Sequence, residues 1–401
     1  MSKWLTVVGI GEDGIGGLSA AASAAIASAQ TLVGGKRHLG LVGATSAECF
    51  EWLSPLDATF DLIAARRNTR VVVLASGDPM WFGIGTTLLK RFSINEMAVL
   101  PHVSAFALAA AEMGWPLDAA EKISLHGRPL EALALHLAPG AKLLALTADR
   151  AAPAAIAAFL AARGYGASPV TVLEHLGGPK MRRIVRTAAS LPPGPYADLN
   201  TLAIECAADA NTLALSRVPG MPDAAFEHDG QLTKRAVRAA TLAALAPLPG
   251  QLLWDIGAGN GSIAIEWLRA VPHTCAIAIE RDAARHARLL HNAQTLGVPH
   301  LQAVAGSAPA AFTGLPAPDA VFVGGGLSTQ GLVDAAWAAL KPGGLFVANA
   351  VTLEGESVLA ELHRSNGGEM MRLAVAHAEP VGPHRGWRAA MPVTQWIGRK
   401  T

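Results

Sequence analysis

The chain has 401 residues, of which 51% are hydrophobic and only 16% charged, and its net charge is +1. This length predicts two or three domains with sizeable cores. The near-neutral charge argues against a broad nucleic-acid surface, and no apolar run approaches the roughly 20 residues of a membrane span. We therefore expect neither nucleic acid nor membrane as a partner. The three cysteines, Cys49, Cys206 and Cys275, are too scattered for a disulfide framework or a metal site, which favours a reducing cytoplasm.

The first half of the chain consists of strand–loop–helix units. Residues 3–8 predict a strand that leads into the glycine-rich turn 9–14. Residues 70–75 predict a buried strand, which Ser76-Gly77-Asp78-Pro79 ends abruptly. In residues 99–106 the plan repeats as a strand, a proline turn and a small polar helix cap. Such strand ends gather at one edge of an open parallel sheet, where ligands bind, although a lone glycine turn is equally consistent with a purely structural role.

Short motifs in this half resemble the tetrapyrrole methylases, and among them the branch that methylates precorrin-6Y. The motifs are Val8-Gly9-Ile10-Gly11, Ser76–Gly83, Pro101–Phe106 and Ser124–Arg128. In that family S-adenosylmethionine (SAM) lies folded between two α/β subdomains. The resemblance implies SAM contacts at Gly9, Asp78, Trp81, Ser104 and Ala105. The first loop departs from the commoner family form, because Glu12-Asp13 stand where a proline is usual.

The remainder of this half continues as α/β, and then the pattern lapses. Residues 181–187 and 201–205 predict a hairpin-like pair of strands. Arginines in the first of them either protect an edge strand from aggregation or bind carboxylates. Apolar periodicity is lost in residues 207–228, where prolines and glycine gather. We therefore predict a domain at residues 1–206, a linker at 207–228 and a second domain at 229–401.

The most informative motif is Asp255-Ile-Gly257-Ala-Gly259-Asn-Gly261, which stands between an apolar run and a helix. The pattern predicts a strand, a tight turn that exposes bare backbone, and a helix N-terminus. A dinucleotide fingerprint would require glycine at Ser262. The motif instead resembles the first motif of the class I SAM methyltransferases. Glu280 ends the next apolar run and is placed to accept both ribose hydroxyls. The alternative is a glycine-rich turn without a ligand.

Later segments extend this second resemblance. Gly306, Ser307 and Ala308 stand where class I methyltransferases contact adenine. Methyltransferases that act on amino groups usually have an acidic or amide residue, followed by two prolines and an aromatic residue, after the fourth strand. In this chain Gly324-Gly325-Gly326 follow that strand instead. These glycines cannot hold an amine and leave room for a bulky flat substrate. The order of segments from 229 to 396 resembles the decarboxylating precorrin methyltransferases. Thr233-Lys234 is either a polar helix start or a lid that contacts substrate.

The two resemblances together imply the fold and the activity. The fold is α/β, with an N-terminal tetrapyrrole methylase fold of two α/β subdomains and a C-terminal Rossmann-like class I SAM methyltransferase domain. The implied enzyme is a bifunctional C-methyltransferase of cobalamin biosynthesis. It methylates C5 in the N-terminal domain, and it methylates C15 and decarboxylates the C12 acetate of a precorrin in the C-terminal domain. The implied ligands are two SAM molecules per chain and no metal, and the implied assembly is a homo-oligomer through the C-terminal domain.

Catalytic residues stay unassigned because methyl transfer needs in-line positioning more than acid–base groups. Candidates are His126, Arg128, Lys234 and His384. The carboxylates of the substrate predict basic clamps, for which Lys36 and Arg37 are further candidates. Substrate contacts are expected at Thr233, Lys234, Gly324, Gly325 and Arg385. Each basic residue is also consistent with a plain surface charge.

Two other functions compete with this one. The first is a single SAM-dependent small-molecule methyltransferase fused to a regulatory tetrapyrrole-binding domain. The second is an unrelated small-molecule or RNA methyltransferase. Two SAM-type sets of loops argue against the first. The near-neutral charge of the chain and the three glycines Gly324–Gly326 argue against an RNA methyltransferase.

Overall fold

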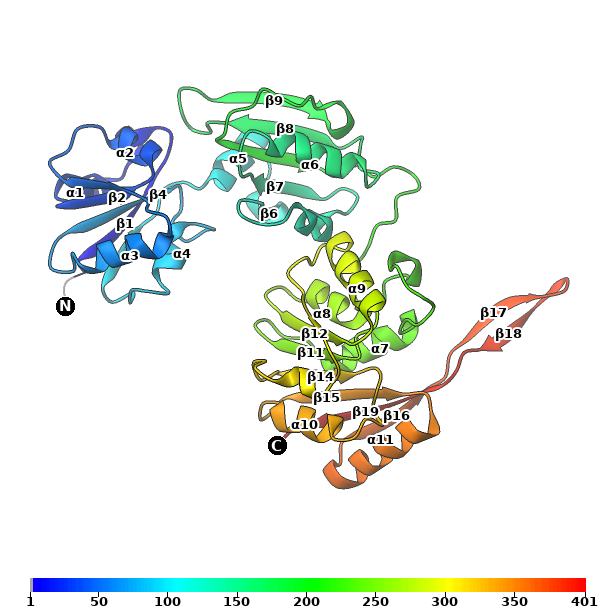
Figure 1. The fold of residues 1–401 in the computed structure, drawn as a ribbon. Helices are drawn as coiled ribbons and strands as arrows, with labels where there is room; N and C mark the ends of the chain where they lie inside the picture. Colours follow the sequence, from blue (N-terminus) through cyan, green and yellow to red (C-terminus); the bar gives the residue numbers. More distant parts are fainter. Residues whose placement is uncertain (1–2) are drawn as a thin grey trace. The chain divides into compact units, whose positions relative to one another are not determined.

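The computed structural model describes residues 3–401, which fold as two compact units (Figure 1). Unit 1 comprises the chain up to Arg128 together with Ala138–Leu213. Unit 2 comprises Pro129–Leu137 and Ala214–Thr401. Unit 2 therefore includes the short helix η3 (Leu130–His136) and most of the segment 207–228.

The first sheet of unit 1 is wholly parallel, with strand order β3-β2-β4-β1-β5. Its central strands are covered on both faces, as their uninterrupted apolar sequences require, and Leu5, Val7 and Val73 are fully buried. The strands are β1 (Leu5–Ile10), β2 (Thr31–Gly34), β3 (Glu48–Glu51), β4 (Val71–Ser76) and β5 (Met97–Leu100). The helices are η1 (Gly14–Gly17), α1 (Ala20–Ala27), α2 (Lys36–Val42), α3 (Leu56–Ala64) and α4 (Ile84–Leu88).

The second sheet of unit 1 is mixed, with order β6-β7-β10-β8-β9, and only β6 and β7 pair in parallel. Its strands are β6 (Glu121–Ser124), β7 (Lys142–Leu146), β8 (Pro169–Glu174), β9 (Arg182–Thr187) and β10 (Asn200–Glu205). Its helices are α5 (Ala105–Met113), η2 (Leu117–Ala119), α6 (Ala152–Ala161) and η4 (Ala188–Ser190).

The expected hairpin of residues 181–187 and 201–205 is wrong. Strand β9 pairs with β8, whereas β10 lies between β7 and β8. The apolar β10 is buried along nearly its whole length, and the arginine-rich β9 is exposed. Burying unpaired arginines is costly, so the charged strand stands at the edge of the sheet and the apolar strand at its centre.

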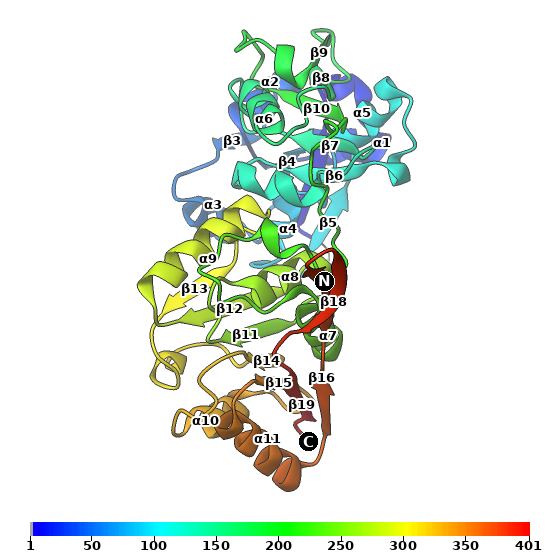
Figure 2. The same cartoon turned by 90° about the vertical axis from the view of Figure 1, so that its right-hand side faces the viewer.

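Unit 2 has a seven-stranded sheet with order β13-β12-β11-β14-β15-β19-β16, whose strands follow one another in Figure 2. The first five are parallel, and β19 runs antiparallel to both neighbours. The strands are β11 (Leu252–Ile256), β12 (Cys275–Glu280), β13 (Gln302–Ala305), β14 (Ala320–Val323), β15 (Leu345–Ala350), β16 (Glu369–Leu373) and β19 (Val393–Arg399). The Rossmann-like arrangement that we predicted is confirmed.

Two helical layers cover this sheet. Helices α7 (Arg235–Leu245), α8 (Ser262–Ala270) and α9 (Ala283–Thr295) pack in one core around the fully buried Trp267. Helices α10 (Leu332–Ala339) and α11 (Leu353–Asn366) pack in the other around the fully buried Trp396. Short helices η5 (Asp223–Ala225) and η6 (Ala310–Phe312) lie in the connections. The separate hairpin of β17 (Ala376–Val381) and β18 (His384–Ala389) projects from the end of β16 and β19 (Figure 1).

Candidate functional site

Unit 2 contains a cavity of about 1500 Å³ at the carboxyl ends of β11, β12 and β14. Small-molecule sites commonly measure about 300–1,000 Å³, so this one has room for more than a single ligand. Most of the residues predicted in this unit line it. They are Thr233, Lys234, Asp255, Gly257, Gly259, Glu280, Gly306, Ser307, Ala308, Gly324 and Gly325.

The three glycines of the loop after β11 have positive φ but different surroundings. A Cβ on Gly257 would lie 2.9 Å from the carbonyl oxygen of Gly325, so two bare backbone segments meet there. A Cβ on Gly259 would meet nothing within 4 Å and would project into open space. A Cβ on Gly261 would lie 2.8 Å from Leu289 of α9. Gly261 does not line the cavity, and it allows α8 and α9 to pack closely.

Two carboxylates stand at the ends of neighbouring strands. Glu280 accepts hydrogen bonds from the backbone N–H groups of Gly259, at 2.7 Å, and Asp282, at 2.8 Å. Asp255 accepts one from the N–H of Ala264 at 3.0 Å through Oδ2, while its buried Oδ1 has no partner in the described chain. Burial raises the pKa of Asp255 to about 7, the bond from Ala264 opposes this rise, and the nearby Glu280 charge adds to it.

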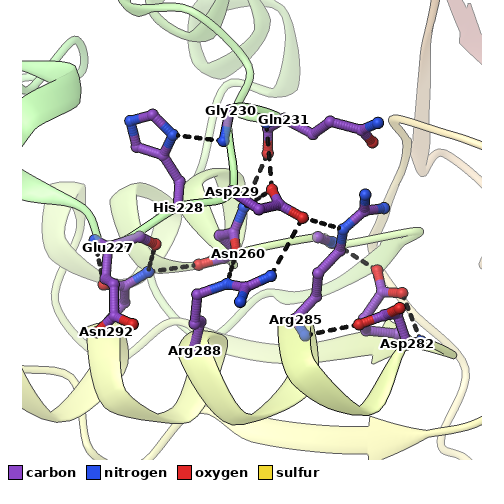
Figure 3. A network of polar contacts seen from close by, with 12 residues as sticks. Glu227, His228, Asp229, Gly230, Gln231, Asn260, Asp282, Arg285, Arg288 and Asn292 are labelled. Carbon is purple, nitrogen blue, oxygen red and sulfur yellow. Dashed lines mark hydrogen bonds and ion pairs between the residues drawn. The ribbon is translucent and has the colours of Figure 1, made fainter.

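The segment before α7 is held against the glycine loop by a polar network (Figure 3). Asp229 Oδ2 accepts hydrogen bonds from Arg285 Nε at 2.8 Å and Arg288 Nη2 at 3.1 Å. Asn260, within the glycine loop, donates to Asp229 and to the carbonyl of Gln231. The bonds from Arg285 and Asn260 hold the pKa of Asp229 far below its usual range. Because Asp229 and Arg285 are 56 residues apart in sequence, no local motif predicts this contact.

This network holds Asp229 and Gln231, which stand just before Thr233 and Lys234 in the sequence, against the glycine loop. Lys234 is the N-cap residue of α7, as expected of a polar helix start, and it is exposed; Thr233 and Lys234 both line the cavity. The residues around the cavity fit SAM. Glu280 suits ribose hydroxyls, the open face of Gly259 admits a ligand against bare backbone, and the unpartnered Asp255 Oδ1 offers an acceptor.

The residues predicted to bind SAM in unit 1 lie at the end of β1, in the turn after β4 and at the start of α5. The carbonyl of Gly77 accepts from His102 N–H at 3.1 Å, and a Cβ on Gly9 would collide with that same carbonyl. Asp78 accepts from Met80 N–H at 2.8 Å within its own turn. Ser104 caps α5 by accepting from Ala107 N–H at 3.1 Å.

The space enclosed by these segments does not fit SAM in this structure. The cavity beside them measures about 60 Å³, which is room for about two water molecules. Ala105 lines it, whereas Gly9, Asp78, Trp81 and Ser104 do not. The Trp81 ring is 38% exposed and stacks obliquely 5.6 Å from Phe106.

Of the other candidates, Arg37 lines the small cavity of unit 1, whereas Lys36, His126, Arg128, His384 and Arg385 line neither cavity. His126 and Arg128 are exposed after β6, with the Arg128 guanidinium 4.8 Å from the centre of the Phe82 ring. His384 and Arg385 are exposed in β18 near the hairpin turn and line neither cavity. Within residues 3–401, no cluster of side chains has the composition to hold a metal ion. Nor does this part of the chain contain a helix that is both long and apolar enough to cross a membrane.

Comparison with known proteins matches both units. The family described as "Tetrapyrrole (Corrin/Porphyrin) Methylases" matches residues 4–192, and the family "Precorrin methyltransferase domain" matches residues 224–400. A "Precorrin-6Y C(5,15)-methyltransferase [decarboxylating]" of Sinorhizobium sp. is 51% identical over 401 residues, which are 100% of this chain and 97% of the relative. The chain belongs to the precorrin-6Y C(5,15)-methyltransferase (decarboxylating) family.

Two shorter relatives are each named for methylation at only one of the two positions, C5 or C15. The "Cobalt-precorrin-7 C(5)-methyltransferase" of Salmonella typhimurium is 40% identical over 174 residues, 43% of this chain and 85% of the relative. The "Cobalt-precorrin-6B C(15)-methyltransferase (decarboxylating)" of the same organism is 34% identical over 166 residues, 40% of this chain and 85% of the relative. The expected family and its methyltransferase character are confirmed.

Proposed function

We propose that this chain methylates precorrin-6Y at C5 and C15 and decarboxylates the C12 acetate to give precorrin-8. The full-length similarity to a precorrin-6Y C(5,15)-methyltransferase supports this proposal. The observation that carries it is the cavity of unit 2, which measures about 1500 Å³ and is lined by the glycine loop, Glu280, Gly324 and Gly325. That space accommodates a methyl donor and a macrocycle together.

Unit 2 carries the C15 methylation and the decarboxylation in this proposal. SAM, when bound, supplies the methyl group. Glu280 and the glycine loop hold its nucleoside end, and the bare backbone of Gly324 and Gly325 faces the flat substrate. Lys234 at the cavity wall is placed to pair with a substrate carboxylate. The acetate loses carbon dioxide when the electron pair of its C–C bond flows into the conjugated imine of the ring, so this unit needs no metal.

Unit 1 carries the C5 methylation, with a second SAM site at Gly9, Asp78, Trp81, Ser104 and Ala105. The match of residues 4–192 to the tetrapyrrole methylases supports this assignment. The two Salmonella relatives, each named for one of the two positions and each matching less than half of the chain, support a division of labour. Because the enclosed space is about 60 Å³, occupancy of this site requires its loops to separate.

The test uses the full-length protein with precorrin-6Y and SAM, followed by product mass and carbon dioxide release. Asp78→Ala is expected to remove one methyl group and leave decarboxylation intact. Gly259→Val is expected to remove the other methyl group together with decarboxylation. A product that still carries both methyl groups in Asp78→Ala, or carbon dioxide release that depends on Asp78, contradicts the division of labour.

Equilibrium dialysis with labelled SAM tests the number of sites. Two sites per chain are expected, of which Gly259→Val removes one and Asp78→Ala weakens the other. A single site, lost in Gly259→Val, favours the alternative in which unit 1 is a regulatory tetrapyrrole-binding domain.

A cytoplasmic homo-oligomer, assembled through unit 2, completes the proposal. The cysteines Cys49, Cys206 and Cys275 are free, in keeping with a reducing compartment. The hairpin of β17 and β18 exposes Val381 by 62% and Trp387 by 79%, an unusual amount of apolar surface for a lone strand pair. Sedimentation equilibrium of the wild type and of Trp387→Ser tests whether this hairpin joins copies of the chain.

A further inference from the structure

The cavity of unit 2 extends well beyond the residues predicted to hold SAM. Those residues stand at the ends of β11, β12 and β13, which are neighbours at one side of the sheet. The lining continues past β14 to the other side of the sheet, where it includes Val351, Leu373, Val375, His377, Met391 and Val393. Neighbouring strands lie about 4.8 Å apart, so β12 and β19, four positions apart in the sheet, are separated by about 19 Å. The second group of residues therefore lies beyond the predicted SAM site.

The direction of the strands places the hairpin of β17 and β18 at this second group. Because β19 runs antiparallel to both β15 and β16, β16 ends and β19 begins at the edge where the parallel strands end. Leu373, the last residue of β16, pairs with Val393, the first residue of β19. The chain between them, residues 374–392, therefore leaves the sheet beside the cavity (Figure 1).

One face of the first leg of the hairpin is turned toward the cavity. Leu373, Val375 and His377 line the cavity, whereas the alternate residues Ala374 and Ala376 do not. This alternation is the period of an extended strand, in which successive side chains point to opposite faces. The face toward the cavity thus presents two apolar side chains and an imidazole.

The second leg of the hairpin carries one extra residue at the same level. Leu373 pairs with Val393 and Ala376 pairs with Ala389, so three steps along the first leg are matched by four along the second. An extra residue of this kind is a β-bulge, which redirects side chains and is frequent next to active sites. Met391 lies within this bulged stretch, lines the cavity and is 69% exposed.

The side chains at this end of the cavity suit a large substrate that is apolar on its faces and carboxylated at its rim. Met391 is unbranched and polarizable, so it packs against surfaces of varied shape. Val351, which follows β15, also lines the cavity and is 50% exposed. Open apolar surface of this kind marks a binding site when polar groups surround it. Lys234 and Arg235 line the same cavity and supply positive charge for carboxylates.

We propose that the base of the β17–β18 hairpin, formed by Val375, His377 and Met391, is a wall of the tetrapyrrole subsite in unit 2. This inference rests on the proposed C15 methylation and decarboxylation by that unit. Val375 and Met391 pack against the face of the macrocycle, and His377 donates a hydrogen bond to one of its carboxylates. SAM occupies the other end of the cavity, so its affinity does not depend on these three side chains.

The competing occupant of this surface is a second copy of the chain, and a cysteine placed there distinguishes the two. In full-length Met391→Cys, mass spectrometry of the peptide follows the rate of alkylation by a maleimide. Precorrin-6Y at about ten times its dissociation constant is expected to slow alkylation about tenfold, since only the unliganded fraction reacts. S-adenosylhomocysteine, which has no methyl group to transfer, is present throughout and is expected to give no protection alone. Ala376→Cys, on the opposite face of the same leg, is the control and is expected to react equally with and without precorrin-6Y.

Three results of this experiment overturn the proposal. The first is an unprotected thiol in Met391→Cys. The second is equal protection of the thiol in Ala376→Cys. The third is protection that follows protein concentration without precorrin-6Y, which assigns the surface to a second copy of the chain.

A charge at the same position gives a second readout. Met391→Asp sets a carboxylate against the carboxylates of the substrate and is expected to raise KM for carbon dioxide release from precorrin-6Y about tenfold or more. The SAM dissociation constant, from calorimetric titration, is expected to stay unchanged, and Ala376→Asp is expected to keep both values. A normal KM in Met391→Asp, or a parallel loss of SAM affinity, overturns the proposal. Absence of carbon dioxide release in the wild type argues against the proposed function, whereas normal release with an unprotected thiol in Met391→Cys argues against the hairpin wall alone.

Discussion

The guanidinium of Arg238 in α7 donates through Nε to the carboxylate of Glu266 in α8 at 2.5 Å, with the two side chains 0% and 2% exposed. The same carboxylate accepts the backbone N–H groups of Gly220 and Met221. Arg238 in turn donates to the carbonyl oxygens of Met221 and Thr233. One buried ion pair therefore attaches both the segment before α7 and the cavity-lining Thr233 to the helix that begins at the glycine loop.

Breaking this pair from one side is expected to destabilise unit 2. Glu266→Gln removes the fully buried counter-ion of Arg238, whose other ionic partner, Asp223 at 3.1 Å, is 30% exposed. Loss of the buried partner of such a pair typically costs about 3–5 kcal/mol. Urea unfolding followed by tryptophan fluorescence measures the loss, since Trp254, Trp267 and Trp396 are buried in this unit. Glu361→Gln is the matched control because its ion pair with Arg364 is exposed on α11, and it is expected to leave the unfolding midpoint unchanged. Equal behaviour of the two variants contradicts the role given to Arg238 and Glu266.

Gly259→Val is expected to weaken SAM binding in unit 2 at least about tenfold, or about 1.4 kcal/mol. The branched side chain would occupy the open space of the cavity and would strain a residue with φ of +57°. Gly250→Val is the control, because Gly250 also has positive φ and open surroundings but lies before β11, outside the cavity. Calorimetric titration of the full-length variants with SAM distinguishes the two positions. An equal loss of affinity in both indicates general backbone strain.

Gly325→Val is expected to weaken binding of the tetrapyrrole substrate without weakening binding of SAM. Gly325 lines the cavity, its φ is not in the left-handed region, and a Cβ there meets nothing within 4 Å, so the variant folds without strain. The added side chain narrows the cavity beside the glycine loop, where the backbones of Gly257 and Gly325 meet. We expect KM for precorrin-6Y in the decarboxylation assay to rise about tenfold or more, with the SAM dissociation constant unchanged. Parallel loss of both affinities would place the macrocycle elsewhere.

Asp255 is expected to stabilise the folded, ligand-free protein at low pH, and this stabilisation is expected to disappear as pH rises from about 4 to about 7. Burial raises the pKa of this carboxyl from 3.8 to about 7, so the folded state holds a proton that the unfolded chain releases. The contribution is complete below the unfolded pKa and is lost as pH rises through the folded one. In Asp255→Asn this titration is absent. The difference in melting temperature, wild type minus variant, should therefore fall across this range, and a flat difference contradicts the buried carboxyl.

Much of the site of unit 2 was predictable because it depends on local rules and parallel topology. Positive φ at Gly257 and Gly259 follows from a tight strand-to-helix turn. Glu280 lies beside that turn because the carboxyl ends of neighbouring parallel strands share one edge of the sheet. The same reasoning placed Gly306 and Gly324 at the cavity, since each directly follows another strand of that edge.

Contacts between distant parts of the chain were decided only by the tertiary structure. The pairs of Asp229 with Arg285 and of Arg238 with Glu266 carry no signal in residue spacing, because each joins segments that meet only after the sheet has formed. Gly261 belongs to the same motif as Gly259, yet the approach of Leu289 makes it a packing position. Likewise, only the arrangement of both sheets in unit 1 brings His175 to Glu12, 163 residues away. Local sequence determines backbone conformation at a turn, whereas the partner of a charged side chain depends on which segments the hydrophobic cores bring together.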